Sequence, residues 1–563
     1  MIDAFDAFDN AAVLDRYLGD PADHSSKMPA SDCLTADKDS AFPQDAIDAL
    51  DDWGVHRAYV PTAFGGTYED PLLPMMLLRQ VARRDLTAAV AHGKTFLGAI
   101  CAWVDGGDIA TRMANLALNG DPIAWGLTER GRGSDLLRSA TSWDCTSGRL
   151  DGGKWPINNA TRGRAICVLV RTRQQFGPRS LSLVLADKQE MSRSSTSYLP
   201  KVRTHGIRGA DISGVEWCDA AVPMDRLVGE QDHGLDLVLR ALQVTRPTCT
   251  ALSLGAADQA VEAVLDFTTE RVVRGRPLAE FATVRADIGA LAADVLLAEA
   301  TALVGARHMA ALPEEMNLVS ACVKYVVPAT VDGAFQRATS TLGARSQLPG
   351  TGVGRRFEKA CRDNRIVGIF DGNSVVNLRT IINEFPAITK GASKNVPELP
   401  LPPGLDPGRP SPTLDLTRLR LMTRGGSTLL AGADELASAL DPGGSNPLSE
   451  ALSSFRTAAA RVTAQVAHAQ RLGAPGAESF ELARRVAEVF AGAACLVVAS
   501  GNARRTALAG DDAWLAAALA RVCQRIGAPL PDASSHYARL ADGVLTSWRA
   551  GSRAVSLFEG WRA

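Results

Sequence analysis

The sequence Arg-Asp-Asn-Arg-Ile-Val-Gly-Ile-Phe-Asp-Gly-Asn-Ser occupies residues 362–374, and the expected fold and function of the whole chain are built on it. One helical pattern ends just before it, at Cys361, and a second one, over 375–384, follows it. The carboxyl group of Asp371 is therefore expected on a turn, next to Gly372, between an apolar segment and a helix start. Desolvation in an apolar cleft raises the pKa of such an acid toward that of a general base. A residue that caps the following helix also suits this position, so the spacing alone leaves both roles open.

The bulk composition is that of a large globular protein. A chain of 563 residues is expected to form two or more structural units. With 46% hydrophobic and 22% charged residues, it has the balance of a folded protein. The formal net charge of -2 gives no electrostatic reason to expect nucleic acid or an anionic membrane as a partner.

Cysteine usage and the N-terminal sequence favour a cytoplasmic protein. The ten cysteines are scattered, without a Cys-x-x-Cys pair, which is typical of reduced thiols. The dispersed cysteines and histidines also give no support for a metal site. The acidic start at residues 1–6 lacks the pattern of a secretory signal. No uncharged run reaches the roughly 18 residues expected of a membrane span.

Changes in hydrophobic pattern and residue composition along the chain predict a mainly α protein of the α+β class. The middle domain contains short β-rich runs at 123–128, 165–170, 181–185 and 215–218, and it is expected to be a barrel or sandwich rather than a parallel sheet. The expected units are an N-terminal helical domain (1–120), a middle β-domain (121–233), a four-helix bundle (234–390), a proline-rich linker (391–413) and a C-terminal helical domain (414–563).

Helical periodicity returns after the β-rich region. It predicts helices at 251–271, 286–309 and 316–342 that pack as an antiparallel bundle. Seven prolines between 397 and 412 predict an extended, semi-rigid spacer. Beyond it, 479–508 and 536–561 are amphipathic. An ordinary packed bundle is the preferred interpretation of these two stretches, with partner or membrane contact as the alternative.

Residues 362–374 resemble the signature of the acyl-CoA dehydrogenases, in which an Arg-Asp pair precedes an Ile-Tyr-Glu-Gly-Thr turn. Gly372 matches this turn outright. Phe370 stands at the tyrosine, Asp371 at the glutamate and Asn373 at the threonine. The resemblance implies that Asp371 is the catalytic base, that Phe370 and Gly372 face the substrate, and that Asn373 contacts the cofactor.

A glycine-rich stretch in the β-domain carries the same resemblance. Residues 127–135 read Leu-Thr-Glu-Arg-Gly-Arg-Gly-Ser-Asp and resemble the family's Thr-Glu-Pro-Gly-Ala-Gly-Ser-Asp loop. This implies that Thr128 meets the flavin ring, and that Gly133 and Ser134 meet the FAD pyrophosphate. Arg130 and Arg132 depart from the pattern, and they either grip an anionic group or lie in solvent.

Three further regions extend the resemblance over about residues 40–390. In 153–160, Asn158 takes the position of a threonine that bonds near flavin N5, while proline replaces the tryptophan that shields the ring. Arg246, expected at the opening of the 251–271 helix, resembles an arginine near the pantetheine channel. Arg271 resembles an arginine that contacts the FAD of a neighbouring subunit. Residues 342–345, Leu-Gly-Ala-Arg, replace a Leu-Gly-Gly loop that makes such a contact in the family, and Arg345 either binds phosphate there or obstructs it.

The resemblance implies an FAD-dependent acyl-thioester dehydrogenase, with the acyl group on CoA or a carrier protein. Asp371 removes the proton α to the thioester, the β-hydrogen leaves as hydride to flavin N5, and a flavoprotein or oxygen then accepts the electrons. The alternatives are a flavin oxidase resembling nitroalkane oxidase, which employs an aspartate, and a catalytically silent scaffold. The extra C-terminal unit is similar to that of very-long-chain acyl-CoA dehydrogenase, which implies a homodimer.

Overall fold

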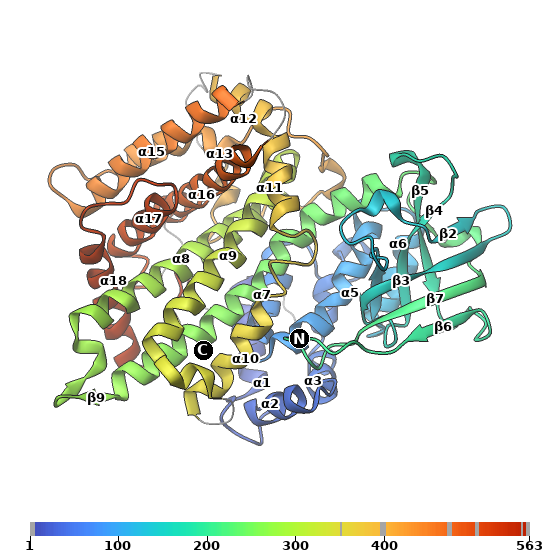
Figure 1. The fold of residues 1–563 in the computed structure, drawn as a ribbon, viewed down its shortest axis with the longest axis horizontal. Helices are drawn as coiled ribbons and strands as arrows, with labels where there is room; N and C mark the ends of the chain where they lie inside the picture. Colours follow the sequence, from blue (N-terminus) through green and yellow to red (C-terminus); the bar gives the residue numbers. More distant parts are fainter. Residues whose placement is uncertain are drawn as a thin grey trace.

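The computed structural model describes residues 6–348, 352–393, 401–469, 476–501, 506–552 and 555–558. Helices dominate, and the main sheet lies at the right of Figure 1, whereas the short strand β9 (Val272–Val273) lies at the lower left. The predicted class, α+β and mainly α, is confirmed.

The N-terminal part contains the helices α1 (Ala7–Leu18), α2 (Ala30–Asp39), α3 (Gln44–Trp53), α4 (Leu72–Arg84), α5 (Leu86–Asp105) and α6 (Asp108–Leu118). Every residue of α4 is buried, including its three arginines. Arg79 makes ion pairs with Asp258 at 3.0 Å and Glu299 at 2.5 Å, both on helices of the later bundle. The arginine face of this helix is therefore an internal contact between domains.

The β-domain is one eight-stranded sheet with the order β6-β7-β3-β2-β4-β5-β8, in which β1 pairs with β4. Its strands are β1 (Ile123–Gly126), β2 (Ser142–Asp144), β3 (Arg149–Asn158), β4 (Ala165–Arg171), β5 (Leu181–Asp187), β6 (Thr196–Leu199), β7 (Ile212–Ala221) and β8 (Leu227–Val228). Most neighbours are antiparallel, and β1 with β4 is the main parallel pair. The four predicted runs lie in β1, β4, β5 and β7.

Alternating residues of the strands serve two cores. Ile166, Val168 and Val184 belong to a core within the β-domain. The intervening residues, such as Cys167 and Leu183, join the large core shared with the helices. This two-sided burial explains why β4 and β5 read as continuous apolar runs.

The bundle contains α7 (Gly234–Glu270), α8 (Ala282–Ala311), α9 (Met316–Leu342), α10 (Gly352–Asn364), α11 (Ser374–Asn383) and α12 (Phe385–Ser393). The prediction that Arg246 lies at a helix opening is wrong, because α7 begins at Gly234 and keeps Pro247 in its interior. An interior proline costs a helix roughly 3 kcal/mol. All residues from Ala241 to Val261 are buried, and this packing supplies the compensation.

The C-terminal part contains α13 (Thr428–Ala431), α14 (Ala433–Ala439), α15 (Pro447–Ala469), α16 (Ala477–Ser500), α17 (Ala513–Arg525) and α18 (Ala533–Arg549). Two predicted helix ends were too late: α16 stops at Ser500 rather than at 508, and α18 at Arg549 rather than at 561, which lies outside the described residues. The apolar faces of α16–α18 are buried against one another and against α8, as the packed-bundle interpretation requires. Buried Asp294 on α8 receives Arg521 at 2.8 Å and Arg525 at 2.6 Å, which ties α17 to the bundle.

The described part of the proline-rich region, 401–413, is not the extended spacer that its composition predicts. Its short 3₁₀ turn, Pro403–Leu405, packs against α8, and Leu405 is fully buried. Arg307 on α8 donates hydrogen bonds to the carbonyls of Pro407 and Arg409 at 3.2 and 2.7 Å. Prolines exclude regular helix here, but apolar contacts still fold the segment onto the bundle. Residues 391–393, predicted to belong to the linker, end α12, and 394–400 lie outside the described residues.

Two helical segments, Ala282–Ala311 and Pro313–Gln347, are long and apolar enough to cross a membrane. The most apolar window of the first is entirely buried inside the protein, and that of the second is 78% buried. Their hydrophobicity therefore serves the core of the bundle.

Candidate functional site

A cavity of about 790 Å³ lies between the β-domain, α5, α7 and the turn before α11. Eight of the predicted site residues line it: Thr128, Gly133, Ser134, Asn158, Arg246, Phe370, Asp371 and Gly372. Most of the remaining wall is apolar, with contributions from Leu97, Trp125, Ile157, Ile212 and Leu252. Tertiary folding thus brings together residues from distant stretches of the sequence.

Asp371 occupies the turn between α10 and α11 in a left-handed conformation, with φ of 54°, and Gly372 follows at 101°. The helix-capping role belongs to a neighbour, because the side-chain oxygen of Asn373 accepts a hydrogen bond from the Val376 amide at 3.0 Å. The capping alternative for Asp371 is therefore wrong, and its carboxyl group is left to face the cavity. A non-glycine residue in this backbone region is a local strain that surrounding contacts must maintain.

Two cations hold this turn through its carbonyl groups. The ammonium group of Lys324, on α9, donates to the carbonyls of Val367 at 2.5 Å and Phe370 at 2.6 Å. Arg246 Nε donates to the carbonyl of Asp371 at 3.2 Å. Burial lowers the pKa of Lys324 to about 8 and that of Arg246 to about 10, and the nearby carboxylate of Asp371 opposes both shifts.

The carboxylate of Asp371 also has a direct partner on α7. The thiol of Cys249 donates to its Oδ2 over 3.7 Å. Burial, reinforced by the negative charge of Asp371, raises the pKa of Cys249 well above its ordinary value. The thiol is therefore protonated at neutral pH, and it orients the carboxylate as a donor.

The glycine-rich loop leaves open space beside its backbone. Gly131 and Gly133 have left-handed φ angles of 76° and 52°, and a Cβ at either position would meet no atom within 4 Å. The two arginines that depart from the family pattern are exposed on this loop. The Arg130 guanidinium lies 4.2 Å from the centre of the Trp155 ring, and Arg132 lies 3.8 Å from the Glu129 carboxylate.

Asn158 presents an unused acceptor at the cavity wall. Its Nδ2 donates to the Val90 carbonyl at 3.0 Å, while its buried Oδ1 receives no hydrogen bond from any described residue. Next to it, Pro156 lines the cavity, whereas Trp155 stacks against Arg130 and is not among the lining residues. The tryptophan is thus displaced from the wall in space as well as in sequence.

Three predicted cofactor contacts lie elsewhere. Arg271 and Arg345 are exposed and do not line the cavity, and Arg345 lies 5.1 Å from the ring centre of Phe267 near the end of α7. Asn373 is occupied as the cap of α11. Ile369, from the apolar segment before Asp371, lines the rim of the cavity and is 60% exposed rather than buried. The 3₁₀-like turn around 366–370 rotates this residue outward while Val367 stays buried.

Two lysines at the site were not singled out from the sequence. Lys94 on α5 lines the cavity, and Lys324 holds the turn from behind. Each is a single lysine within a long apolar helical run. Such an isolated charge is a usable signal, because charged residues are rarely buried without a partner or a function.

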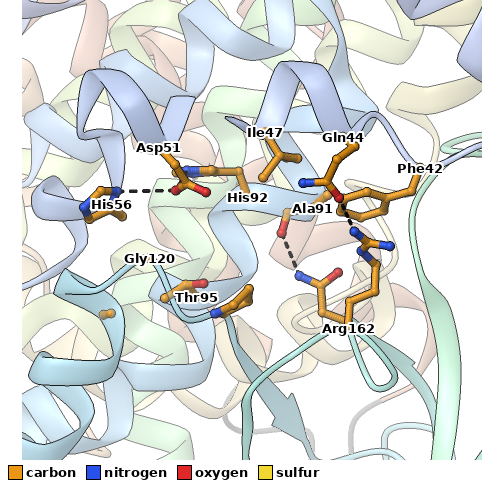
Figure 2. A pocket seen from close by; sticks show the side chains of 13 residues that line it. Phe42, Gln44, Ile47, Asp51, His56, Ala91, His92, Thr95, Gly120 and Arg162 are labelled. Atoms are coloured by element: carbon orange, nitrogen blue, oxygen red, sulfur yellow. Dashed lines mark hydrogen bonds and ion pairs between the residues drawn. The ribbon is translucent and has the colours of Figure 1, made fainter. Parts of the chain in front are cut away.

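A second, smaller cavity of about 220 Å³ lies on the opposite side of α5. Figure 2 shows Asp51 beside His56 and His92 at one end, and Arg162 near Gln44 at the other. Asp51 lies 3.4 Å from His56 and 3.2 Å from His92. Burial alone would raise the pKa of Asp51, but the two imidazoles hold it well below its usual value. This cluster joins α3 to α5 and so braces the wall that carries Lys94.

Comparisons with known proteins agree with this arrangement. Residues 232–385 match the family model for the acyl-CoA dehydrogenase C-terminal domain. The probable acyl-CoA dehydrogenase FadE25 of Mycobacterium tuberculosis is 25% identical over 358 residues, which cover 62% of this chain and 90% of FadE25.

Two solved structures define the extent of the fold. An acyl-CoA dehydrogenase from Bacillus anthracis superimposes with a TM-score of 0.72 and 17% identity, covering 96% of this chain and 95% of its own. Butyryl-CoA dehydrogenase from Megasphaera elsdenii gives a TM-score of 0.61 and 20% identity, covering 68% of this chain and 98% of its own. The first similarity extends through the C-terminal helices, and the second stops short of the full chain. The chain therefore has the fold of the acyl-CoA dehydrogenases, and its residues 232–385 match the C-terminal domain of that family.

Proposed function

We propose that this protein is an FAD-dependent acyl-thioester dehydrogenase in which Asp371 is the catalytic base. The observation that carries the proposal is that Asp371 shares one cavity with the glycine-rich loop and Asn158. The apolar walls limit the access of water, which favours proton transfer to a positioned carboxylate.

The cavity has features that suit FAD. Open space beside Gly131 and Gly133 admits an anionic group close to backbone amides, and Thr128 and Ser134 offer hydroxyl groups at the same wall. The unused Oδ1 of Asn158 suits a ring N–H donor. FAD, when bound there, supplies a hydride acceptor. The Bacillus anthracis relative is described as complexed with FAD, which supports this assignment.

The residues of the chain then have distinct roles. Asp371 accepts the proton from the carbon next to the thioester. Lys324 and Arg246 hold the turn that presents Asp371, and the Cys249 thiol orients its carboxylate. An aspartate is shorter than a glutamate by about 1.5 Å. A misplacement of this size costs on the order of 100-fold in rate, so this bracing of the turn is expected to matter.

The proposal includes a cytoplasmic homodimer. All ten cysteines are free, which is consistent with a reducing compartment. Arg271 and Arg345 are exposed near the end of α7, away from the cavity of their own chain, as contacts to a second subunit would be. The physiological electron acceptor is proposed to be a flavoprotein or oxygen.

The substitution Asp371→Asn tests whether Asp371 is the catalytic base. We expect purified wild-type protein to show a flavin absorption spectrum that bleaches anaerobically with an acyl-CoA or acyl-carrier substrate. Asp371→Asn is expected to keep the flavin and lose bleaching, because an amide accepts no proton. Unchanged bleaching in Asp371→Asn would remove Asp371 from its role. A colourless protein that takes up no FAD would favour a silent scaffold.

A second candidate is a flavin oxidase resembling nitroalkane oxidase. The observation that favours it is the displaced Trp155, which leaves Pro156 rather than an aromatic ring at the cavity wall. A less shielded flavin is more open to oxygen. Reducing the flavin anaerobically with substrate and then admitting oxygen separates the two: fast reoxidation with release of peroxide indicates an oxidase, and slow reoxidation a dehydrogenase.

A further inference from the structure

Lys94 is the only lysine or arginine in α5, a helix with a long apolar run. Its side chain lines the large cavity between Gly93 and Leu97, and its ammonium group lies 5.8 Å from the ring centre of Trp125. The charge of Asp371 acts on it, but the two groups form no ion pair within 4.0 Å. Burial lowers the pKa of Lys94, so its environment is not that of a solvated surface lysine.

Lys94 is only partly buried, and the three buried lysines of the described structure show how this chain satisfies a lysine ammonium group away from solvent. Lys154 pairs with Glu129 at 2.7 Å. Lys359 pairs with Asp85 at 2.7 Å and Asp363 at 2.6 Å. Lys324 donates to two carbonyls. In contrast, Lys94 makes no hydrogen bond or ion pair with any described residue. A cation in an apolar wall without an acceptor is costly unless a ligand provides one.

The charges around the cavity point to the chemistry of that ligand. Three basic groups, Lys94, Arg246 and Lys324, lie within electrostatic reach of a single nearby acid, Asp371. Lys324 and Arg246 are already occupied by the carbonyls of the turn. Arg246 uses only its Nε in this way, so Lys94 and the terminal N–H groups of Arg246 have donors left over at the cavity, and their natural complement is an anion.

The position of Lys94 also indicates which part of the substrate carries the anion. Lys94 shares its wall with apolar residues, including Leu97 and Trp125, rather than with exposed polar groups. Such a wall suits an acyl chain better than the hydrated phosphates of a carrier. Lys94 and Asp371 line the same cavity, so a substrate whose reacting carbon meets Asp371 can extend its acyl chain toward Lys94.

We propose that Lys94 binds a carboxylate at the far end of the acyl group, so that the preferred substrates are acyl thioesters of dicarboxylic acids. The inference rests on the proposed acyl-thioester function and adds the substrate class. A charge-assisted hydrogen bond of this kind contributes roughly 10-fold to 100-fold in affinity.

The test compares CoA monothioesters of straight-chain dicarboxylic acids with methyl-terminated thioesters of matched chain length. Equilibrium binding is measured by calorimetry on FAD-loaded protein in the Asp371→Asn background, which prevents turnover. We expect the carboxylate-terminated thioester to bind at least about 10-fold more tightly. Lys94→Met is expected to abolish this preference, Lys94→Arg to retain most of it, and the exposed control Lys38→Met to leave it unchanged.

The outcomes separate the two proposals. If methyl-terminated thioesters bind as well as or better than their carboxylate-terminated partners, the role of Lys94 is overturned while the acyl-thioester function stands. The same conclusion follows if Lys94→Met keeps the preference. If no thioester binds and the protein takes up no FAD, both proposals fail. If Lys94→Met does not fold, the comparison of carboxylate-terminated with methyl-terminated thioesters in protein that keeps Lys94 still tests the proposed substrate class.

Discussion

The substitution Lys324→Met tests how the turn that presents Asp371 is held. Lys324 is 1% exposed, and its ammonium group donates to the carbonyls of Val367 and Phe370. Methionine has a similar length and an apolar end, so it fills the space but donates no hydrogen bond. The substitution leaves both carbonyl oxygens without that donor.

The loss of unfolding free energy in Lys324→Met depends on pH, because burial disfavours the charged form of Lys324. Each orphaned carbonyl costs about 2 kcal/mol, or about 4 kcal/mol for the pair. Burial lowers the pKa of Lys324 from 10.5 to about 8, which at 1.36 kcal/mol per pKa unit is a charging penalty of about 3 kcal/mol. Methionine escapes this penalty. The net loss of unfolding free energy at pH 7 is therefore expected to be only about 1 kcal/mol.

Raising the pH should enlarge the difference in unfolding free energy between wild type and Lys324→Met. Between pH 8 and 10.5 the folded wild-type chain has released the Lys324 proton while the unfolded chain still binds it, so wild-type stability rises with pH. A neutral amine still has two N–H donors for the two carbonyls. Lys324→Met lacks this titration, and its deficit is expected to grow by about 2.5 kcal/mol between pH 7 and pH 10.

Urea unfolding of wild type and Lys324→Met at pH 7 and pH 10 measures these values. Lys359→Met is the matched control: burial opposes its charge, but Asp363 and Asp85 raise the pKa of Lys359 above 10.5, so its deficit should stay constant between pH 7 and pH 10. A deficit of Lys324→Met that stays level or shrinks as the pH rises would refute the reasoning. With acyl-thioester substrates, the variant is also expected to lose rate more than affinity, because Asp371 is less well positioned.

Two further predictions concern the supports around the site. Arg521→Met leaves the buried carboxylate of Asp294 with one fewer close arginine and should lower the free energy of unfolding by about 3 kcal/mol; an unchanged calorimetric melting temperature would contradict this. Asn373→Ala removes the cap of α11 and should cost about 1 kcal/mol, whereas Asn373→Ser should retain most of the stability. If Asn373→Ala instead releases bound FAD without loss of stability, the cofactor contact predicted from the sequence is the better description of this residue.

Local patterns predicted much of the fold because they act over short distances. The helix at Met316–Leu342 was predicted residue for residue, and the four apolar runs of the β-domain became strands. In contrast, β3 was not among the predicted strand runs, since Gly152, Gly153 and Pro156 interrupt its strand pattern. The register shifts of β3 against β7 accommodate these residues, and such shifts depend on the partner strand.

Helix ends were predicted less well where tertiary contacts override local preference. Pro247 appeared to mark a helix start. However, α7 continues through it because the helix is buried from Ala241 to Val261, and this packing offsets the cost of the interior proline. The proline-rich segment was expected to be extended, yet the burial of Leu405 against α8 folds it onto the bundle. In both cases packing free energy exceeds the local backbone preference.

By itself, the sequence determined the resemblance to the acyl-CoA dehydrogenases, the mainly α class and the identity of Asp371 as the acid on a glycine-assisted turn, because these are properties of residue type and spacing. Only the tertiary structure decided which basic groups surround that acid. Lys94, Arg246 and Lys324 come from three different helices, and the carbonyl groups that accept hydrogen bonds from Arg246 and Lys324 lie far away in the sequence. Charge and desolvation act through space, so whether a lysine is satisfied or left to meet a substrate depends on which helices the fold places around it.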